Sequence, residues 1–407
     1  MGRKYIVLCG DGMADYPIAE LDGKTPLQAA DTPNLDRLAR RGTLGIVRTV
    51  PLGFPPGSDV ANLSIFGYDP ALYYTGRAPL EAASMGVRLD LHDVAFRCNL
   101  ITLGSRNGRE YMEDFSAGHI STEEAREVIA QIGDALGSEE FRFYPGVSYR
   151  HLMVWRNGER SLGVKTTPPH DITGKEVAPY LPRGRGQEVI LRLMEEAKKA
   201  LPDCPVNLGR KKNGKKPANG IWLWGQGKAP SFLPMTKRFG LRGSVISAVD
   251  LMKGIGFYAG LEIVDVPGVT GYLDTNYAGK AEYALREISR KDLVYVHVEA
   301  PDEASHNGSL KDKIQAIEDL DRKIVGPISE GLEKYPDFHL MVLPDHPTPI
   351  QLKTHSSEPV PFVIFSAGDR RKALKKDRAF DEASASQTTL FVERGHELME
   401  KFIRGFA

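Results

Sequence analysis

The sequence predicts an α/β fold whose core is a mostly parallel sheet flanked by helices, with a smaller α+β domain inserted into it. Short apolar runs typical of buried strands alternate with amphipathic helical segments before residue 85 and after residue 181. Between these segments the apolar residues recur with a period near two, which is typical of half-buried antiparallel strands. The 407 residues also exceed the length at which one core usually keeps growing. We therefore expect a core of residues 1–85 and 181–407 and an inserted domain of residues 86–180.

The first segment predicts a strand at residues 4–9, a helix from Thr32 to Gly42 and a short strand at 44–50. Thr32 suits a helix N-cap, the proline after it suits the first turn, and Gly42 suits the end of the helix. A loop rich in proline and glycine then carries Ser58, and a helix is expected at 60–66.

The inserted domain and the second half of the core follow the same periodicities. In the insert we expect strands at 87–91, 94–100, 141–143 and 149–155, and a helix at 121–132 that begins with the capping box Ser121 to Glu124. In the remaining core, strands are expected at 221–224, 261–264, 293–298, 339–343 and 361–365, and helices at 187–200, 247–254, 278–289, 311–332 and 387–404.

Composition and charge argue against several classes of protein. Lysine plus arginine number 53, as do aspartate plus glutamate, so no bulk charge favours nucleic acid or an anionic membrane. No stretch approaches the roughly 18 apolar residues of a membrane span. Three cysteines without paired spacing suit a reducing compartment. We therefore expect a cytoplasmic protein without nucleic-acid or membrane partners, and the sequence leaves its oligomeric state open.

Residues of the kind that bind metal ions follow several of the expected buried strands. Because open α/β sheets bind ligands at the carboxyl ends of their strands, such residues can converge although they lie far apart in the sequence. Carboxylates with imidazoles can hold Mn²⁺, Zn²⁺ or Mg²⁺, and a hydroxyl beside such ions is a candidate nucleophile. The candidates are Asp11, Asp302, His306, Asp345, His346 and His355, with the loop serine Ser58.

The spacing and charge of these residues sharpen the hypothesis. Asp302 and His306 are four residues apart, which places both side chains on one face of a helix. Three aspartates carry three negative charges, so two divalent ions would leave the site near +1 and favour a phosphate or sulfate ester. A serine hydroxyl beside such ions has a lowered pKa and can attack phosphorus in line, while the ions neutralise the phosphoryl oxygens.

Four segments resemble the alkaline phosphatase superfamily, and most closely its cofactor-independent phosphoglycerate mutases of the archaeal type. They are Cys9–Met13, Gly57–Asn62, Ala300–His306 and the stretch from Pro344 to His355. The resemblance covers nearly the whole chain and implies an alkaline-phosphatase-like core interrupted by a cap domain. It implies one ion held by Asp11, Ser58, Asp345 and His346, a second held by Asp302, His306 and His355, and a transiently phosphorylated Ser58. Manganese is the expected metal, with magnesium, cobalt or zinc as alternatives.

The resemblance also implies a reaction and a substrate. A phosphoglycerate would give its phosphoryl group to Ser58, and the trapped glycerate would take it back on its other hydroxyl, in glycolysis or gluconeogenesis. Trapping requires a lid that keeps water from the phosphoserine. We expect the inserted domain to bind the carboxylate and phosphate of the substrate, because guanidinium groups bind such anions in a bidentate manner. The candidate substrate-binding residues are Arg97, Arg150, His170, Asp171 and, from the core, Lys253.

Other functions fit less well. A phosphomonoesterase or a phosphotransferase with another acceptor, such as homoserine, could use the same core. A P-loop kinase is disfavoured because Val164 stands where the lysine of that motif is required. A dinucleotide fold is disfavoured because Asp15 occupies the position of the third glycine. An inactive binding protein would lack some of the candidate ligands, and this chain has all of them.

Overall fold

The chain divides into two compact units. The computed structural model describes residues 2–375 and 377–406. The smaller unit is Thr75–Pro230, and the rest of the chain forms the larger unit. The predicted insert of residues 86–180 is therefore too short. Strand β7 (Gly220–Gly227) pairs with β3 (Val94–Arg106), and its apolar side chains share a core with those of helix α7 (Gln187–Ala200), so both elements belong to the smaller unit.

The larger unit is built on a mixed, mostly parallel sheet. In the described part of the chain this sheet has eight strands in the order β13-β2-β12-β11-β1-β10-β8-β9. Strand β12 runs antiparallel to both of its neighbours, and the other pairings are parallel. The strands are β1 (Lys4–Gly10), β2 (Thr43–Val47), β8 (Gly243–Ile246), β9 (Glu262–Ile263), β10 (Leu293–Val298), β11 (Phe338–Leu343), β12 (Val360–Ser366) and β13 (Phe391–Val392).

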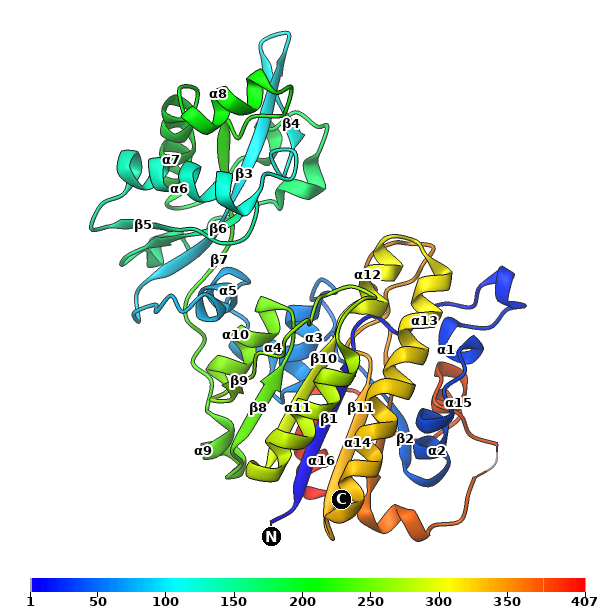
Figure 1. Cartoon of the computed structure of the whole chain (residues 1–407). Helices are drawn as coiled ribbons and strands as arrows, with labels where there is room; N and C mark the ends of the chain where they lie inside the picture. Colours follow the sequence, from blue (N-terminus) through cyan, green and yellow to red (C-terminus); the bar gives the residue numbers. More distant parts are fainter. Residues whose placement is uncertain (1, 376, 407) are drawn as a thin grey trace. The chain divides into compact units, whose positions relative to one another are not determined.

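Helices cover both faces of this sheet (Figure 1). Successive side chains of a strand point to opposite faces. Ile6 of β1 joins a buried cluster with Leu38 and Ile317 of the helices on one face, whereas its neighbour Tyr5 contacts Phe402 of a helix on the other, with ring centroids 5.5 Å apart. The first face carries α2 (Pro33–Arg41), α11 (Tyr277–Arg290), α13 (Leu310–Leu320) and α14 (Gly326–Gly331), and the second carries α3 (Ser58–Ile65), α10 (Asp250–Tyr258) and α16 (Leu398–Arg404).

The smaller unit is an antiparallel sheet packed against helices, as the sequence predicts. Strand β3 is central and pairs with three others. Helix α6 (Thr122–Leu136) begins with the expected capping box, in which Ser121 Oγ accepts a hydrogen bond from the Glu124 amide at 3.2 Å. The remaining elements are β4 (Arg109–Asp114), β5 (Phe141–Tyr144), β6 (Arg150–Trp155) and α8 (Pro205–Lys212).

Two expected elements are wrong. Residues 87–91 alternate in hydropathy but pair with no strand in the described chain, and Leu91 is 73% exposed. The expected C-terminal helix at 387–404 is instead the short strand β13 followed by α16. Short helices elsewhere include α1 (Pro26–Ala29), α4 (Pro70–Tyr73), α5 (Ala78–Ser84) and α9 (Met235–Phe239).

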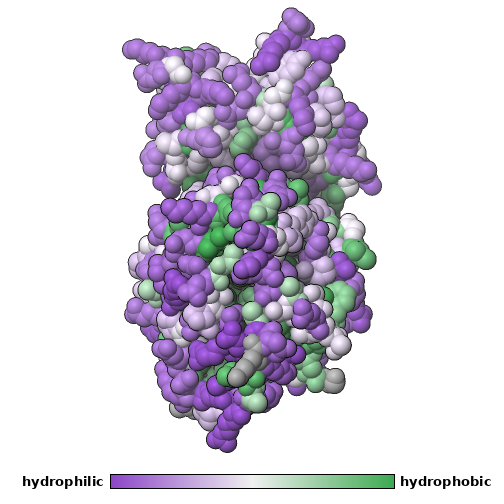
Figure 2. All heavy atoms as spheres, turned by 90° about the vertical axis from the view of Figure 1, so that its right-hand side faces the viewer, coloured by the Kyte–Doolittle hydropathy of each residue, from purple (hydrophilic) through white to green (hydrophobic). Residues whose placement is uncertain are grey.

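The face of the protein shown in Figure 2 is mostly hydrophilic, as expected when apolar side chains are buried in the core. Hydrophobic residues form smaller groups on this face. Among the described residues, no helix has both the length and the apolar character that a membrane crossing requires.

Candidate active site

Three strands bring the three candidate aspartates together. Asp11 directly follows β1, Asp345 lies two residues beyond β11, and Asp302 lies in helix α12 (Ala300–His306), which begins two residues after β10. Strand β1 pairs in parallel with both β10 and β11, so the three carboxyl ends meet at one edge of the sheet. All three aspartates are buried.

The candidate histidines surround these carboxylates. The spacing in α12 sets His306 Nε2 3.2 Å from Asp302 Oδ2, as the sequence predicts. His355 Nε2 lies 3.0 Å from His306 Nε2 and 3.5 Å from Asp302 Oδ1. The ring of His346 lies 4.2 Å from that of His355 between centroids. The structure therefore places the four residues Asp302, His306, His346 and His355 in one cluster.

Ser58 is the first residue of α3 and faces the same cluster. Its Oγ lies 3.1 Å from His346 Nε2. One turn further along the helix, the Asn62 amide donates to the Ser58 carbonyl oxygen at 2.9 Å and to Asp345 Oδ2 at 2.8 Å. The Tyr295 hydroxyl in turn donates to Asn62 Oδ1 at 2.6 Å. Ser58 thus lies at a helix N-terminus, where the helix dipole favours a bound anion, and Asn62 links the backbone of Ser58 to Asp345.

Buried carboxylates and imidazoles dominate the electrostatics of the cluster. Burial raises the pKa of Asp11 well above its usual value, and the carboxylates of Asp345 and Asp302 raise it further. Burial would also raise the pKa of Asp302, but its histidine partners outweigh this and hold it well below the usual range. The hydrogen bond to Asp302 raises the pKa of His306 to about 9. Among the described residues, no lysine or arginine pairs with these three aspartates.

One orphaned atom shows where a cation fits. Oδ1 of Asp11 is buried and accepts no hydrogen bond, although it lies 3.5 Å from His346 Nε2. A buried acceptor without a partner is costly unless a ligand satisfies it. Asp11, Asp345 and His346 each offer an atom within 4.8 Å of the others, and so do Asp302, His346 and His355. These donors suit divalent ions such as Mn²⁺, Zn²⁺ or Mg²⁺.

Four residues near this cluster were not predicted from the sequence, namely Cys9, Asn62, His297 and Thr348. Cys9 and His297 face each other across β1 and β10, and with Asp345 they form a third group of metal-type side chains. His297 Nε2 is buried 3.1 Å from Asp11 Oδ2. Thr348 donates a hydrogen bond of 2.5 Å to Asp302 Oδ1. A histidine inside an apolar strand was a visible signal, whereas Asn62 and Thr348 look like ordinary helix and loop residues.

The predicted substrate-binding residues of the smaller unit lie near one another. Arg97 is buried, its Nε donates to Glu81 at 2.9 Å, and its guanidinium lies 4.3 Å from the centre of the Trp224 ring. His170 contacts the same tryptophan with ring centroids 5.5 Å apart, and Asp171 lies 3.6 Å from its Nε2. Burial lowers the pKa of Arg97, and the nearby charges of Arg77 and Arg150 contribute to this. Arg77, Glu81 and Trp224 were not predicted.

Lys253 is not brought to the metal-type cluster. It lies in α10, and its ammonium pairs with Asp265 at 2.9 Å. Within the described residues, no ion pair or hydrogen bond joins it to a candidate metal ligand. The structure therefore gives no support for contact between Lys253 and a phosphate.

The fold and this site are typical of metal-dependent enzymes that transfer phosphoryl groups. A family model described as 2,3-bisphosphoglycerate-independent phosphoglycerate mutase matches residues 39–207. A protein of that name from Methanosarcina acetivorans is 54% identical to this chain, over 98% of this chain and all of its own length. The chain belongs to the 2,3-bisphosphoglycerate-independent phosphoglycerate mutase family, as the resemblance in its motifs led us to expect.

Two solved structures share the whole fold. The structure of a Pyrococcus horikoshii protein superimposes with a TM-score of 0.82 at 29% identity, over 100% of this chain and 99% of its own. The cofactor-independent phosphoglycerate mutase of Thermoplasma acidophilum superimposes with a TM-score of 0.67 at 29% identity, over 99% of both chains. The predicted fold class is confirmed over the full length of the chain.

Proposed function

We propose that this chain is an isomerase that interconverts 2-phosphoglycerate and 3-phosphoglycerate through a phosphoserine at Ser58, in cytoplasmic glycolysis and gluconeogenesis. The observation that carries the proposal is the position of Ser58 Oγ, 3.1 Å from His346 Nε2 at the N-terminus of α3. The full-length relatives named as 2,3-bisphosphoglycerate-independent phosphoglycerate mutases support the choice of substrate.

The metal assignment is part of the proposal. Asp11, Ser58, Asp345 and His346 would hold one divalent ion, and Asp302, His306 and His355 the other. Manganese is the proposed metal, with magnesium, cobalt or zinc as alternatives. When bound, such ions lower the pKa of a hydroxyl and neutralise charge on phosphoryl oxygens.

The residues of the chain carry out the remaining steps. Ser58 Oγ bonds to phosphorus as the bond between phosphorus and the glycerate oxygen breaks, and the serine proton passes to that oxygen. The other hydroxyl of the retained glycerate then attacks the phosphoserine, which restores Ser58. The N-terminus of α3 stabilises the transferred anion. We assign binding of the substrate to Arg97, Arg150, His170 and Asp171, with the guanidinium groups of Arg97 and Arg150 binding its carboxylate and phosphate.

The first test combines activity with detection of the intermediate. The protein, stripped of metal and reloaded with Mn²⁺, should interconvert the two phosphoglycerates without 2,3-bisphosphoglycerate, and acid-quenched samples should carry one phosphate on Ser58 by mass spectrometry. Ser58→Ala should lose both signals. Ser64→Ala, in the same helix, should keep both, because Ser64 Oγ donates only to the Val60 carbonyl oxygen. Normal turnover by Ser58→Ala would rule out the phosphoserine.

The second test separates the mutase from its alternatives. A mutase reaction in ¹⁸O-labelled water should release no labelled phosphate, because water does not attack the phosphoserine. Faster release of labelled phosphate than formation of isomer would instead identify a phosphomonoesterase. Phosphorylation of homoserine in a panel of acceptors would identify a phosphotransferase.

A further inference from the structure

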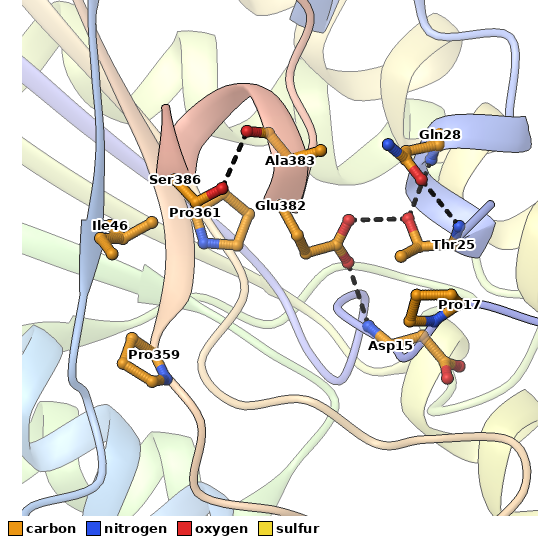
Figure 3. Close-up of a pocket in the computed structure, with 10 residues that line it drawn as sticks. All are labelled: Asp15, Pro17, Thr25, Gln28, Ile46, Pro359, Pro361, Glu382, Ala383 and Ser386. Carbon is orange, nitrogen blue, oxygen red and sulfur yellow. Dashed lines mark hydrogen bonds between the residues drawn. The ribbon is translucent and has the colours of Figure 1, made fainter. Parts of the chain in front are cut away.

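The larger unit contains a pocket that is separate from the candidate active site. Its volume is about 390 Å³, within the range of small-molecule sites. It lies between the loop after β1, strand β2, the start of β12 and helix α15 (Glu382–Ser386). Three prolines (Pro17, Pro359 and Pro361) and the branched side chain of Ile46 form apolar walls of this pocket (Figure 3).

Glu382 supplies the main polar group of this pocket. In Figure 3 its side chain extends between Pro361 on one side and Thr25 on the other. One carboxylate oxygen accepts a hydrogen bond of 3.1 Å from the Asp15 amide, and the other accepts one of 2.7 Å from the Thr25 hydroxyl. A carboxylate has about four acceptor positions, so roughly two remain free for a ligand.

Glu382 lacks a positively charged partner. Within the described chain, no lysine, arginine or histidine forms an ion pair with it, and burial raises its pKa to about 7. The nearby ammonium of Lys313 already donates to Asp15, Thr348 and Ala14. An enclosed carboxyl group of this kind is costly to ionise unless a cation approaches it.

The charges that line the pocket are of one sign. Asp15 and Glu382 are acidic, and none of the described lining residues is basic. The carboxylate of Asp15 is occupied by the Lys313 ammonium and by the amides of Tyr16 and Ile350. Glu382 is therefore the group left to bind a cation.

We propose that this pocket binds a small organic ammonium ion, whose apolar body packs against the prolines and whose N–H groups donate to Glu382. The proline walls are already fixed in conformation, so binding orders few side chains. The site is independent of Ser58 chemistry and can be tested with the Ser58→Ala protein as well as the wild type.

The test compares three probes of similar shape and different charge on the full-length protein. 2-Phenylethylammonium, 2-phenylethanol and phenylacetate are titrated at pH 8, where Glu382 is ionised, and binding is measured by saturation-transfer difference NMR. Because only the ammonium ion carries a charge opposite to that of the ionised Glu382, it should bind about tenfold or more tightly than the alcohol. Phenylacetate should not bind.

Three variants complete the test. Glu382→Gln should weaken binding of the ammonium ion about tenfold and that of the alcohol much less, and the retained binding of the alcohol also shows that the pocket remains folded. Glu358→Gln, an exposed acid beside Pro359 but outside the lining, should change neither affinity. Ser386→Trp should block both probes. Equal affinities for ammonium and alcohol, unchanged ammonium binding in Glu382→Gln, or no binding of any probe would overturn the proposal.

Discussion

The Nζ atom of Lys313 lies 2.8 Å from Oδ2 of Asp15, and neither side chain is exposed to solvent. The same ammonium donates to the carbonyl oxygens of Thr348 at 2.9 Å and Ala14 at 3.3 Å, so all three of its protons are used. This buried ion pair joins helix α13 to the loop after β1 and to the loop after β11. The Thr348 hydroxyl in turn contacts Asp302 and His346. The ion pair therefore fixes the position of a residue that contacts two candidate metal ligands.

Replacing Lys313 with methionine should destabilise the larger unit strongly. The variant leaves the Asp15 carboxylate buried without its cation, and breaking a buried pair in this way costs about 3–5 kcal/mol. Urea denaturation followed by circular dichroism should show this loss in the free energy of unfolding. Lys311→Met, an exposed position in the same helix, should stay within about 0.5 kcal/mol of the wild type. Equal stability of the two variants would show that the ion pair contributes little to the free energy of unfolding.

Thr348→Val should weaken metal binding more than it weakens folding. The Thr348 hydroxyl donates to Asp302 Oδ1 at 2.5 Å and lies 3.2 Å from His346 Nδ1. If it accepts the Nδ1 proton, it leaves Nε2 of His346 free to bind an ion. Loss of such a supporting group typically lowers metal affinity about 10–100-fold, which calorimetric titration with Mn²⁺ would measure. The exposed Thr354→Val should bind Mn²⁺ as the wild type does, and an unchanged affinity in Thr348→Val would contradict the role of Thr348.

Local patterns explain why much of the site could be predicted. Strand β10 has the predicted bounds of Leu293–Val298, because a short apolar run between polar residues is a strong strand signal. The four-residue spacing of Asp302 and His306 likewise gives the same helical face in the sequence and in the structure. The remaining ligands follow from the rule that parallel strands present their carboxyl ends at one edge.

Features that depend on pairing between distant segments could not be predicted. The roles of Cys9 and His297 require the register that sets these two residues opposite each other in β1 and β10. The boundary of the smaller unit was missed because β7 lies more than 110 residues after the strand it pairs with, beyond the amphipathic helix α7. The reversed direction of β12 also has no local signature.

Glu382→Gln should become more stabilising as the pH rises. Burial raises the pKa of Glu382 to about 7 from an ordinary value near 4.5, so the folded state favours the protonated form. The contribution of protonated Glu382 to the free energy of unfolding is fully present below pH 4.5 and is lost as the pH rises through 7. Glutamine stays neutral, so the difference in free energy of unfolding between variant and wild type should shift by about 2 kcal/mol in favour of the variant between pH 5 and pH 8. A difference that does not change with pH would contradict the raised pKa.

Divalent metal should stabilise the protein by relieving repulsion among its buried aspartates. Because the ions bind the folded state, Mn²⁺ at a hundred times its dissociation constant should add about 3 kcal/mol to the free energy of unfolding, and chelation should remove it. Asp11→Asn removes a carboxyl group whose charged form is disfavoured by burial and by the neighbouring Asp345 and Asp302, so without metal the variant should be at least as stable as the wild type. With Mn²⁺ it should gain less, since one ligand is lost. Thermal unfolding with and without chelator, at constant ionic strength set with KCl, measures both effects. An equal gain in the variant and the wild type would exclude Asp11 from the metal site.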